Sequence, residues 1–200
     1  MIMTARWTRR FALAAALAAS TTTAGAQSWT ATLTGAAEAP PNSSLGIGSA
    51  TFTLTGTVLR IQGSFSGLTG ITTVAHIHCC TALPGPATAG VATTTPTFVG
   101  FPVGVSAGTF DLLLDLNQSS SFNSAFVTAN GGTLATARAR LLSGMNDGTS
   151  YLNIHSSTFP GGEIRGFILT TVPEPASMLL LGSGLLGLAG IAARRKHGAR

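Results

Sequence analysis

The sequence predicts a mainly β fold, an antiparallel β-sandwich with a small helical insertion. Short segments alternate apolar with polar residues, which is the pattern of a strand that packs one face on a core. Glycine, proline and asparagine separate these segments, as they do at tight turns. Only 8% of the residues are charged, while threonine, serine, glycine and alanine are frequent. This composition suits short strands in one ordinary domain, which we place at residues 27–171.

The N-terminal segment has the three parts of a secretory signal peptide. A basic stretch precedes an apolar run over residues 11–19. Ala24 and Ala26 then form the small-x-small site at which signal peptidase cleaves. We therefore expect residues 1–26 to be removed on export, so that the mature protein begins at Gln27.

Seven segments in the middle of the chain carry the strand pattern. They are residues 29–33, 48–57, 58–65, 74–78, 109–116, 151–155 and 163–170. Gly56 and Thr57 are a plausible tight connection, and residues 160–162 turn the sixth segment back onto the seventh as a hairpin. Residues 81–108 form a long connection with four prolines. A loop of that length indicates a functional or mobile segment.

Two helices are predicted between the fifth and sixth strands. In residues 119–129, Phe122 and Phe126 recur at helical spacing, and serines at the start are candidate caps. Residues 133–143 place leucine and alanine on one side. The glycines within residues 130–132 separate the two helices.

The C-terminal segment predicts a transmembrane helix. Residues 176–193 carry no charge and span ~27 Å as a helix, enough to cross a hydrocarbon core. The basic tail at residues 194–200 stays on the cytoplasmic side, which leaves the domain outside.

A short motif precedes this helix: Val172, Pro173, Glu174 and Pro175. Together with the apolar helix and the arginine-rich tail, it resembles the PEP-CTERM sorting signal of Gram-negative bacteria, over residues 172–200. The resemblance implies a precursor anchored in the inner membrane through the C-terminal helix, and processing by an exosortase. It also implies delivery to the cell surface or the exopolysaccharide matrix. An ordinary C-terminal membrane anchor is the alternative.

The charge of the mature domain excludes nucleic-acid binding. The whole chain has a net charge of +5. Residues 27–171, however, hold four arginines against five acidic residues, so that the excess of positive charge belongs to the terminal segments. A nucleic-acid-binding domain needs a basic patch on the folded domain itself.

The residues able to carry chemistry lie on three short predicted strands. Side chains two residues apart on a strand share one face. If these strands are neighbours, one face of the sheet collects six polar side chains: His76, His78, Asn153, His155, Glu163 and Arg165.

The histidines of this face predict a metal site. His76, His78 and His155 would form a three-nitrogen site suited to copper or zinc. In this hypothesis the Glu163 carboxylate orients a ligating imidazole, and Arg165 is its ion-pair partner. The alternative is a polar face without a ligand, in which the histidines bond to Asn153, Glu163 and the backbone.

Cys79 and Cys80 directly follow the histidine strand. Exposed free thiols do not persist in an oxidising compartment. We expect a vicinal disulfide that stiffens the start of the long loop. The alternatives are a thiolate that joins His76 and His78 at a metal, and pairing with another molecule.

Three motifs resemble the CHRD domain, first described in the developmental antagonist chordin and abundant in bacterial surface proteins. They are Ala-His-Ile-His at 75–78, Tyr-x-Asn-x-His at 151–155 and Pro-Gly-Gly-Glu-Ile-Arg-Gly at 160–166. The resemblance extends over most of residues 28–170, and it implies an immunoglobulin-like fold. Residues 79–80 depart from the family, in which many members carry glycine or another small residue there.

Two classes of function follow. The first, which we expect, is a non-catalytic exported module that binds a matrix polysaccharide or a surface protein, either with or without a metal at the three-histidine face. The second is a metal-dependent enzyme of the periplasm or matrix that uses the same histidines. No serine lies on a Gly-x-Ser-x-Gly turn, and Asp111 and Asp115 show no sign of an acid/base pair. We therefore assign no catalytic residue.

Overall fold

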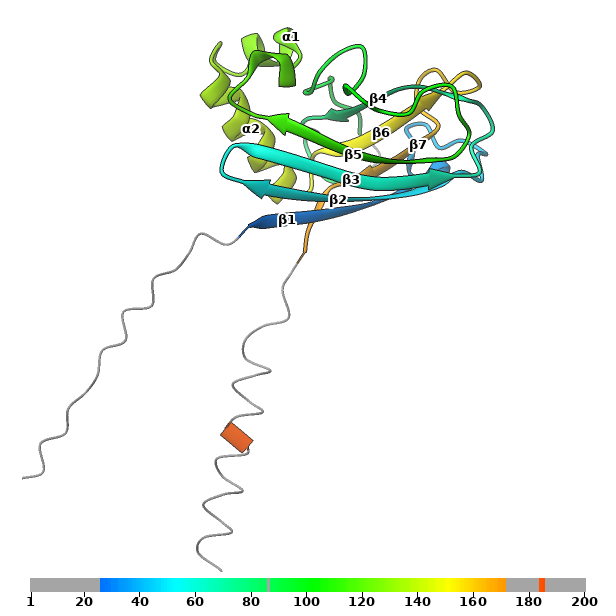
Figure 1. Ribbon diagram of the computed structural model, residues 1–200, viewed down its shortest axis with the longest axis horizontal. Helices are drawn as coiled ribbons and strands as arrows, with labels where there is room; N and C mark the ends of the chain where they lie inside the picture. Colours follow the sequence, from blue (N-terminus) through cyan, green and yellow to red (C-terminus); the bar gives the residue numbers. More distant parts are fainter. Residues whose placement is uncertain (1–25, 86, 172–183, 186–200) are drawn as a thin grey trace, which may run out of the picture.

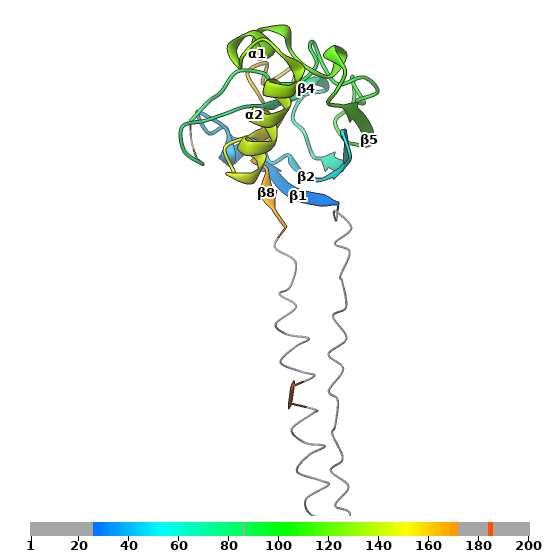
Figure 2. The same cartoon turned by 90° about the vertical axis from the view of Figure 1, so that its left-hand side faces the viewer.

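A single antiparallel sheet organises the domain. The computed structural model describes residues 26–85, 87–171 and 184–185. The strand order is β4-β6-β7-β1-β2-β3-β5, and β8 pairs with β1. The strands are β1 (Gln27–Thr34), β2 (Ile47–Thr55), β3 (Val58–Ser66), β4 (Thr72–His78), β5 (Gly108–Asp115), β6 (Tyr151–Ser156), β7 (Ile164–Phe167) and β8 (Leu169–Thr170). Figures 1 and 2 show this sheet curled into an open half-barrel.

The alternating pattern places the strands as the sequence predicts. Phe52 of β2 and Ile61 of β3 are register partners, and both are fully buried. Gly56 takes a φ of +61° in the turn between these strands, a conformation that glycine adopts without steric cost. The antiparallel, mainly β prediction is confirmed.

The expectation of two stacked sheets is corrected by the topology. Strand β1 pairs with β2 along one edge, and with β7 and β8 along the other. On the second edge, Thr34 pairs with Arg165 of β7, and Trp29 pairs with Thr170 of β8. Because β1 is paired on both sides, the sheet stays continuous. It buries its apolar face by curling rather than by splitting into an immunoglobulin-like sandwich.

Gly166 allows this close approach of β7 to β1. A Cβ atom built at Gly166 would overlap the backbone carbonyl of Thr32. Backbone atoms of a central strand cannot move aside without breaking the ladder of β1. Glycine is therefore required at this position for steric reasons.

Strands β4, β6 and β7 are buried on both faces. Ile77 and Ile154 face the common core, with Trp29 and Phe52 of the other half of the sheet. All six residues of β6 are buried. The opposite, polar face lies under the loops that follow β1 and β4 and under the turn after β6, whose carbonyl groups bond to it. The polar face is thus an interior surface.

Two α-helices pack beside the curled sheet (Figure 2). The first predicted helix is divided into a 3-10 turn (Ser119–Ser121) and α1 (Ser124–Ala129). The Asn123 side chain accepts a hydrogen bond from the Ala125 N–H, so asparagine rather than serine caps α1. Helix α2 (Leu134–Asn146) runs three residues beyond its predicted end and places its buried side chains in the core.

The terminal predictions lie outside the described residues. These are the signal peptide with Ala24, the motif at 172–175 and the basic tail at 194–200. Of the predicted transmembrane helix, only residues 184–185 are described, and they are helical. Within the part of the chain that the structure describes, no helix is long and apolar enough to cross a membrane.

Replacing Gly166 by alanine should destabilise the domain, because the added methyl group overlaps the β1 backbone. We expect Gly166→Ala to lower the free energy of unfolding by about 3 kcal/mol. The control is Gly161→Ala, where an added Cβ has no atom within 4 Å and should change stability by less than about 0.5 kcal/mol. Urea denaturation of the two variants measures both effects. Equal stability would contradict the steric role of Gly166.

Candidate metal centre

The register between β4 and β6 gathers three histidines on one face of the sheet. His76 lies opposite Asn153, and His78 lies opposite Tyr151. His155, two residues along β6 from Asn153, shares this face. One ring nitrogen of each histidine lies within 4.8 Å of the other two. Among the described residues, no other three histidine, cysteine or acidic side chains are grouped in this way.

Each histidine is anchored by one ring nitrogen to a backbone carbonyl. The bonds are His76 Nε2 to Pro96 O, His78 Nδ1 to Ala89 O at 2.9 Å and His155 Nδ1 to Pro160 O at 2.8 Å. A carbonyl oxygen only accepts hydrogen bonds, so the bonded nitrogen of each ring carries the proton. The second nitrogen of each ring therefore presents a lone pair.

These lone pairs are buried and have no hydrogen-bond partner. The unpartnered atoms are His76 Nδ1, His78 Nε2 and His155 Nε2. Leaving a buried acceptor unpaired costs about 1–3 kcal/mol. Of the hydrogen bonds expected for a polar face without a ligand, those to the backbone are present, whereas none of the three rings bonds to Asn153 or Glu163.

Burial keeps the imidazoles of His76 and His78 neutral. Desolvation lowers the pKa of His78 to about 4, although the hydrogen bond to Ala89 opposes this shift. Desolvation likewise lowers the pKa of His76, against the hydrogen bond to Pro96. A neutral ring is the form that binds a metal ion, so both rings are ready to coordinate at neutral pH.

Glu163 lies apart from the histidine cluster. Its carboxylate accepts hydrogen bonds from the Ser44 hydroxyl and from the backbone N–H groups of Thr69 and Gly70. The carboxylate thus fixes the loop between β3 and β4. The structure gives it no bond to an imidazole and no ion pair with Arg165, in contrast to the role that the sequence suggested.

Arg165 is buried beside the cluster and is fully engaged. Its guanidinium donates hydrogen bonds to the carbonyls of Ala37, Gly85 and Ala87. The guanidinium carbon lies 4.7 Å from the centre of the Tyr151 ring. Arg165 therefore ties β7 to the two loops that cover the polar face.

Tyr151 in turn stacks on His78. The ring centres are 4.8 Å apart, and the ring planes differ by 6°. Because Arg165 packs on the same tyrosine ring, a cation, an aromatic ring and an imidazole form one stack. This stack holds the plane of the His78 ring.

Glu38 is the ionic partner of Arg165, and the sequence analysis missed this role. Its Oε2 lies 4.0 Å from Arg165 Nε, and the side chain is buried. Burial raises the pKa of Glu38 to about 7, while the charge of Arg165 opposes the rise. A signal was available, because Glu38 is the only acidic residue that precedes Asp111 in a chain poor in charge.

The cysteines lie against α2 rather than among the ring nitrogens. Cys79 and Cys80 are joined by a disulfide. A Cβ atom built at Gly144 of α2 would lie 2.8 Å from the Cys79 sulfur, so the helix approaches the disulfide closely at this glycine. Neither sulfur belongs to the group of ligand atoms.

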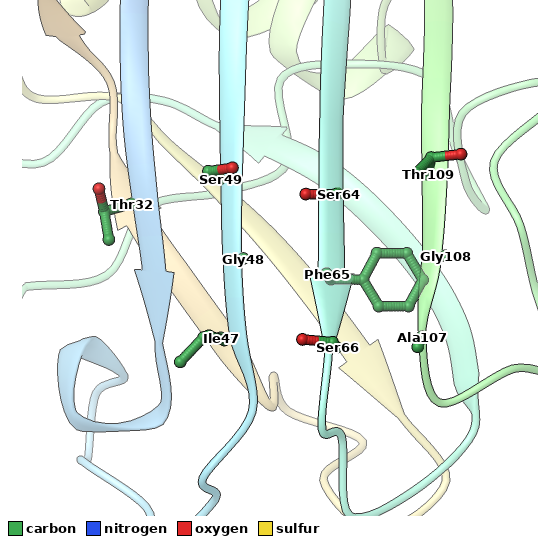
Figure 3. Close-up of a pocket in the computed structure, with 10 residues that line it drawn as sticks. All are labelled: Thr32, Ile47, Gly48, Ser49, Ser64, Phe65, Ser66, Ala107, Gly108 and Thr109. Atoms are coloured by element: carbon green, nitrogen blue, oxygen red, sulfur yellow. The ribbon is translucent and has the colours of Figure 1, made fainter.

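A separate groove of about 690 Å³ crosses the outer face of β1, β2, β3 and β5 (Figure 3). Its lining carries hydroxyl and apolar side chains and no titratable group. The lining residues are Thr32, Ile47, Gly48, Ser49, Ser64, Phe65, Ser66, Ala107, Gly108 and Thr109. None of the three histidines reaches this groove.

The structure defines a curled antiparallel β domain with a buried cluster of three histidines. The family model of the CHRD domain matches residues 29–168, well over half of the chain. The chain therefore belongs to the CHRD domain family. The PEP-CTERM protein-sorting motif matches residues 171–196, which indicates export, a membrane-anchored precursor in Gram-negative bacteria and processing by exosortase. The comparison with curated proteins returns no match.

Acid should destabilise the metal-free protein through His78. The pKa of this residue is about 4 in the folded state against an ordinary 6.5, so the unfolded chain binds the proton first. The contribution of His78 is complete above pH 6.5 and is lost as the pH falls towards 4. The parent should lose stability relative to His78→Gln over this range, as measured by urea denaturation. The titration of Glu38 affects the parent and His78→Gln alike, so it cancels in their difference. If the difference in stability between the two proteins stays constant between pH 6.5 and 4, the assignment to His78 is refuted.

Proposed function

We propose that the domain is a non-catalytic binding module of the cell surface or extracellular matrix that holds one copper or zinc ion at His76, His78 and His155. The observation that supports this is the difference in hydrogen bonding between the two nitrogens of each ring. One nitrogen is anchored to a carbonyl, and the other is buried without a partner. Carbonyl groups behind the ligands are the usual supports of metal-bound histidines.

The chemistry of the donors selects the metal. Three neutral imidazole nitrogens suit copper and zinc, whereas calcium and magnesium prefer oxygen ligands. Coordination would satisfy three buried acceptors at once. The cost of leaving them unpaired, about 1–3 kcal/mol each, would then be offset by the bound ion.

The surroundings of the ring nitrogens favour binding over catalysis. The histidines are 6–9% exposed, and no carboxylate joins the group of ligand atoms. Within the described residues, the site thus offers three enclosed nitrogen ligands and no carboxylate among them. A matrix polysaccharide or a surface protein would be bound elsewhere on the domain.

A metal-dependent enzyme is the second candidate. Three protein ligands leave a fourth position for water or substrate, as in catalytic zinc sites. Azide or cyanide that changes the spectrum of the copper-loaded protein would favour this candidate. An unchanged spectrum would favour the closed binding module.

Metal retention should depend equally on the histidines of β4 and on the histidine of β6. We expect His155→Ala to abolish retention of copper or zinc as fully as His76→Ala, because either change leaves only two nitrogens. Asp111→Asn is the control, since this exposed carboxylate pairs with Arg60 away from the site. Equilibrium dialysis followed by plasma mass spectrometry measures the metal. Full retention of copper or zinc by His155→Ala would refute the three-histidine site.

Processing should depend on the basic tail. Removing residues 194–200 takes away the positive charges that hold the C-terminal segment in the membrane with its tail in the cytoplasm. We expect the truncated protein to fail exosortase processing and release, as seen by fractionation and immunoblotting. Unchanged delivery to the surface would argue against exosortase sorting.

A further inference from the structure

A cleft opens at the surface beside the turn that anchors the His155 ring. It lies between residues 38–42 and residues 158–162 and has a volume of about 280 Å³. The Asn42 side chain spans its two walls, because its amide donates hydrogen bonds to the carbonyls of Gly162 and Glu163. The walls are therefore held at a fixed separation.

The cleft narrows from an exposed rim to a buried floor. Pro41 and Gly161 at the rim are exposed, whereas Glu38 and Gly162 at the floor are buried. Pro160 in the same wall supplies the carbonyl that anchors the His155 ring. One hydrogen bond thus joins the wall of the cleft to the His155 ring.

Two oxygen atoms without hydrogen-bond partners lie close to Gly162 of this floor. Glu38 Oε1 and Asn153 Oδ1 are buried and unpartnered, and their side chains are 5% and 3% exposed. Both atoms lie close to Gly162. A Cβ added to this glycine would lie 2.8 Å from Glu38 Oε1 and 2.7 Å from Asn153 Oδ1. Because residue 162 is glycine, the side chains of Glu38 and Asn153 can occupy the space that a Cβ would fill.

Asn153 connects this pair with the histidines. It lies directly opposite His76 in the register of β4 and β6, and directly opposed residues of an antiparallel pair share a face. Glu38 thus lines the cleft, Asn153 lies beside Glu38 at Gly162, and Asn153 faces His76 across the two strands. All the unpartnered buried side-chain atoms of the described residues accept hydrogen bonds, and they all belong to this path.

The charge of Glu38 matters for a cation on this path. Arg165 lies 4.0 Å from Glu38 and would repel a divalent ion if its charge were not balanced. When the Glu38 carboxylate is ionised, the pair is close to neutral, and an approaching ion meets an oxygen ligand first. Replacing Glu38 by a neutral residue would leave the positive charge alone at the floor.

We propose that this cleft is the entrance through which the metal ion reaches His76, His78 and His155, with Glu38 and Asn153 as transient oxygen ligands. The inference rests on the proposed metal-binding function. An ion that enters must shed its water molecules, and the two unpartnered oxygens replace them step by step. Glu38 and Asn153 then govern the rate of loading, whereas the three imidazoles govern the affinity.

Stopped-flow mixing of the purified, metal-free protein with copper(II) or zinc(II) salt tests the entrance. Gly161→Trp places a large side chain at the rim, where an added Cβ meets no atom within 4 Å and the glycine has no left-handed φ. Glu38→Gln keeps the size of the floor residue and removes its charge. We expect uptake to slow about tenfold or more in each variant, with an unchanged equilibrium Kd.

Gly90→Trp is the matched control. Gly90 is exposed and equally unhindered, but it lies on the other loop that covers the histidines. We expect this variant to load metal at the parent's rate. Slowing by Gly90→Trp, with the parent's rate kept in Gly161→Trp, would move the entrance to the other loop and overturn the proposal.

The remaining outcomes separate the two proposals. Parental loading rates in both Gly161→Trp and Glu38→Gln would overturn the entrance and leave the three-histidine site intact. A weaker Kd in Glu38→Gln with normal uptake would make Glu38 a determinant of affinity instead, which also overturns it. If the parent protein itself takes up no metal, the proposed function fails, and the entrance fails with it.

Discussion

The close pairing of β7 with β1 is the constraint on which the rest of the domain depends. At Gly166 the two backbones approach so closely that no side chain fits between them. The contact joins the half of the sheet that carries the core aromatics to the half that carries the histidines. It also places the neighbouring Arg165 under the loops, where the guanidinium binds their carbonyls. The continuous sheet and the buried polar face thus have one origin.

A polar surface in the interior normally satisfies itself, because unpaired buried groups are costly. Here the donors are satisfied: Arg165 is bonded to carbonyls, and so is one nitrogen of each imidazole. What remains is a set of lone pairs, three on nitrogen and two on the oxygens of Glu38 and Asn153. An excess of acceptors over donors is the pattern that a cation complements. This imbalance, rather than the count of histidines alone, distinguishes the site from an ordinary polar core.

Alternation along the chain was sufficient to predict the strands and to place His76 and His78 on one face, because strand parity is a local property. That His155 joins them depends on the pairing of β4 with β6, which the sequence analysis could state only as a condition. The sequence could not predict that the sheet stays continuous, since the pairing of residues 29–34 with 165–170 is non-local and depends on a missing Cβ. The role of Glu38 was hidden for the same reason, as it meets Arg165 only after β1 and β7 pair. Glu163 was misplaced because strand parity gives the face of a side chain but not the loop that captures it.

The anchors of the imidazoles have an evolutionary consequence. All three are main-chain carbonyls, at Ala89, Pro96 and Pro160, so the side chains of these residues take no part in the bonds. Substitutions in the covering loops should be tolerated as long as the path of the chain is kept. Lineages could therefore diverge widely in these loops while retaining the same ligand geometry. A search for the site through loop side chains would miss such relatives, whereas the strand motifs would find them.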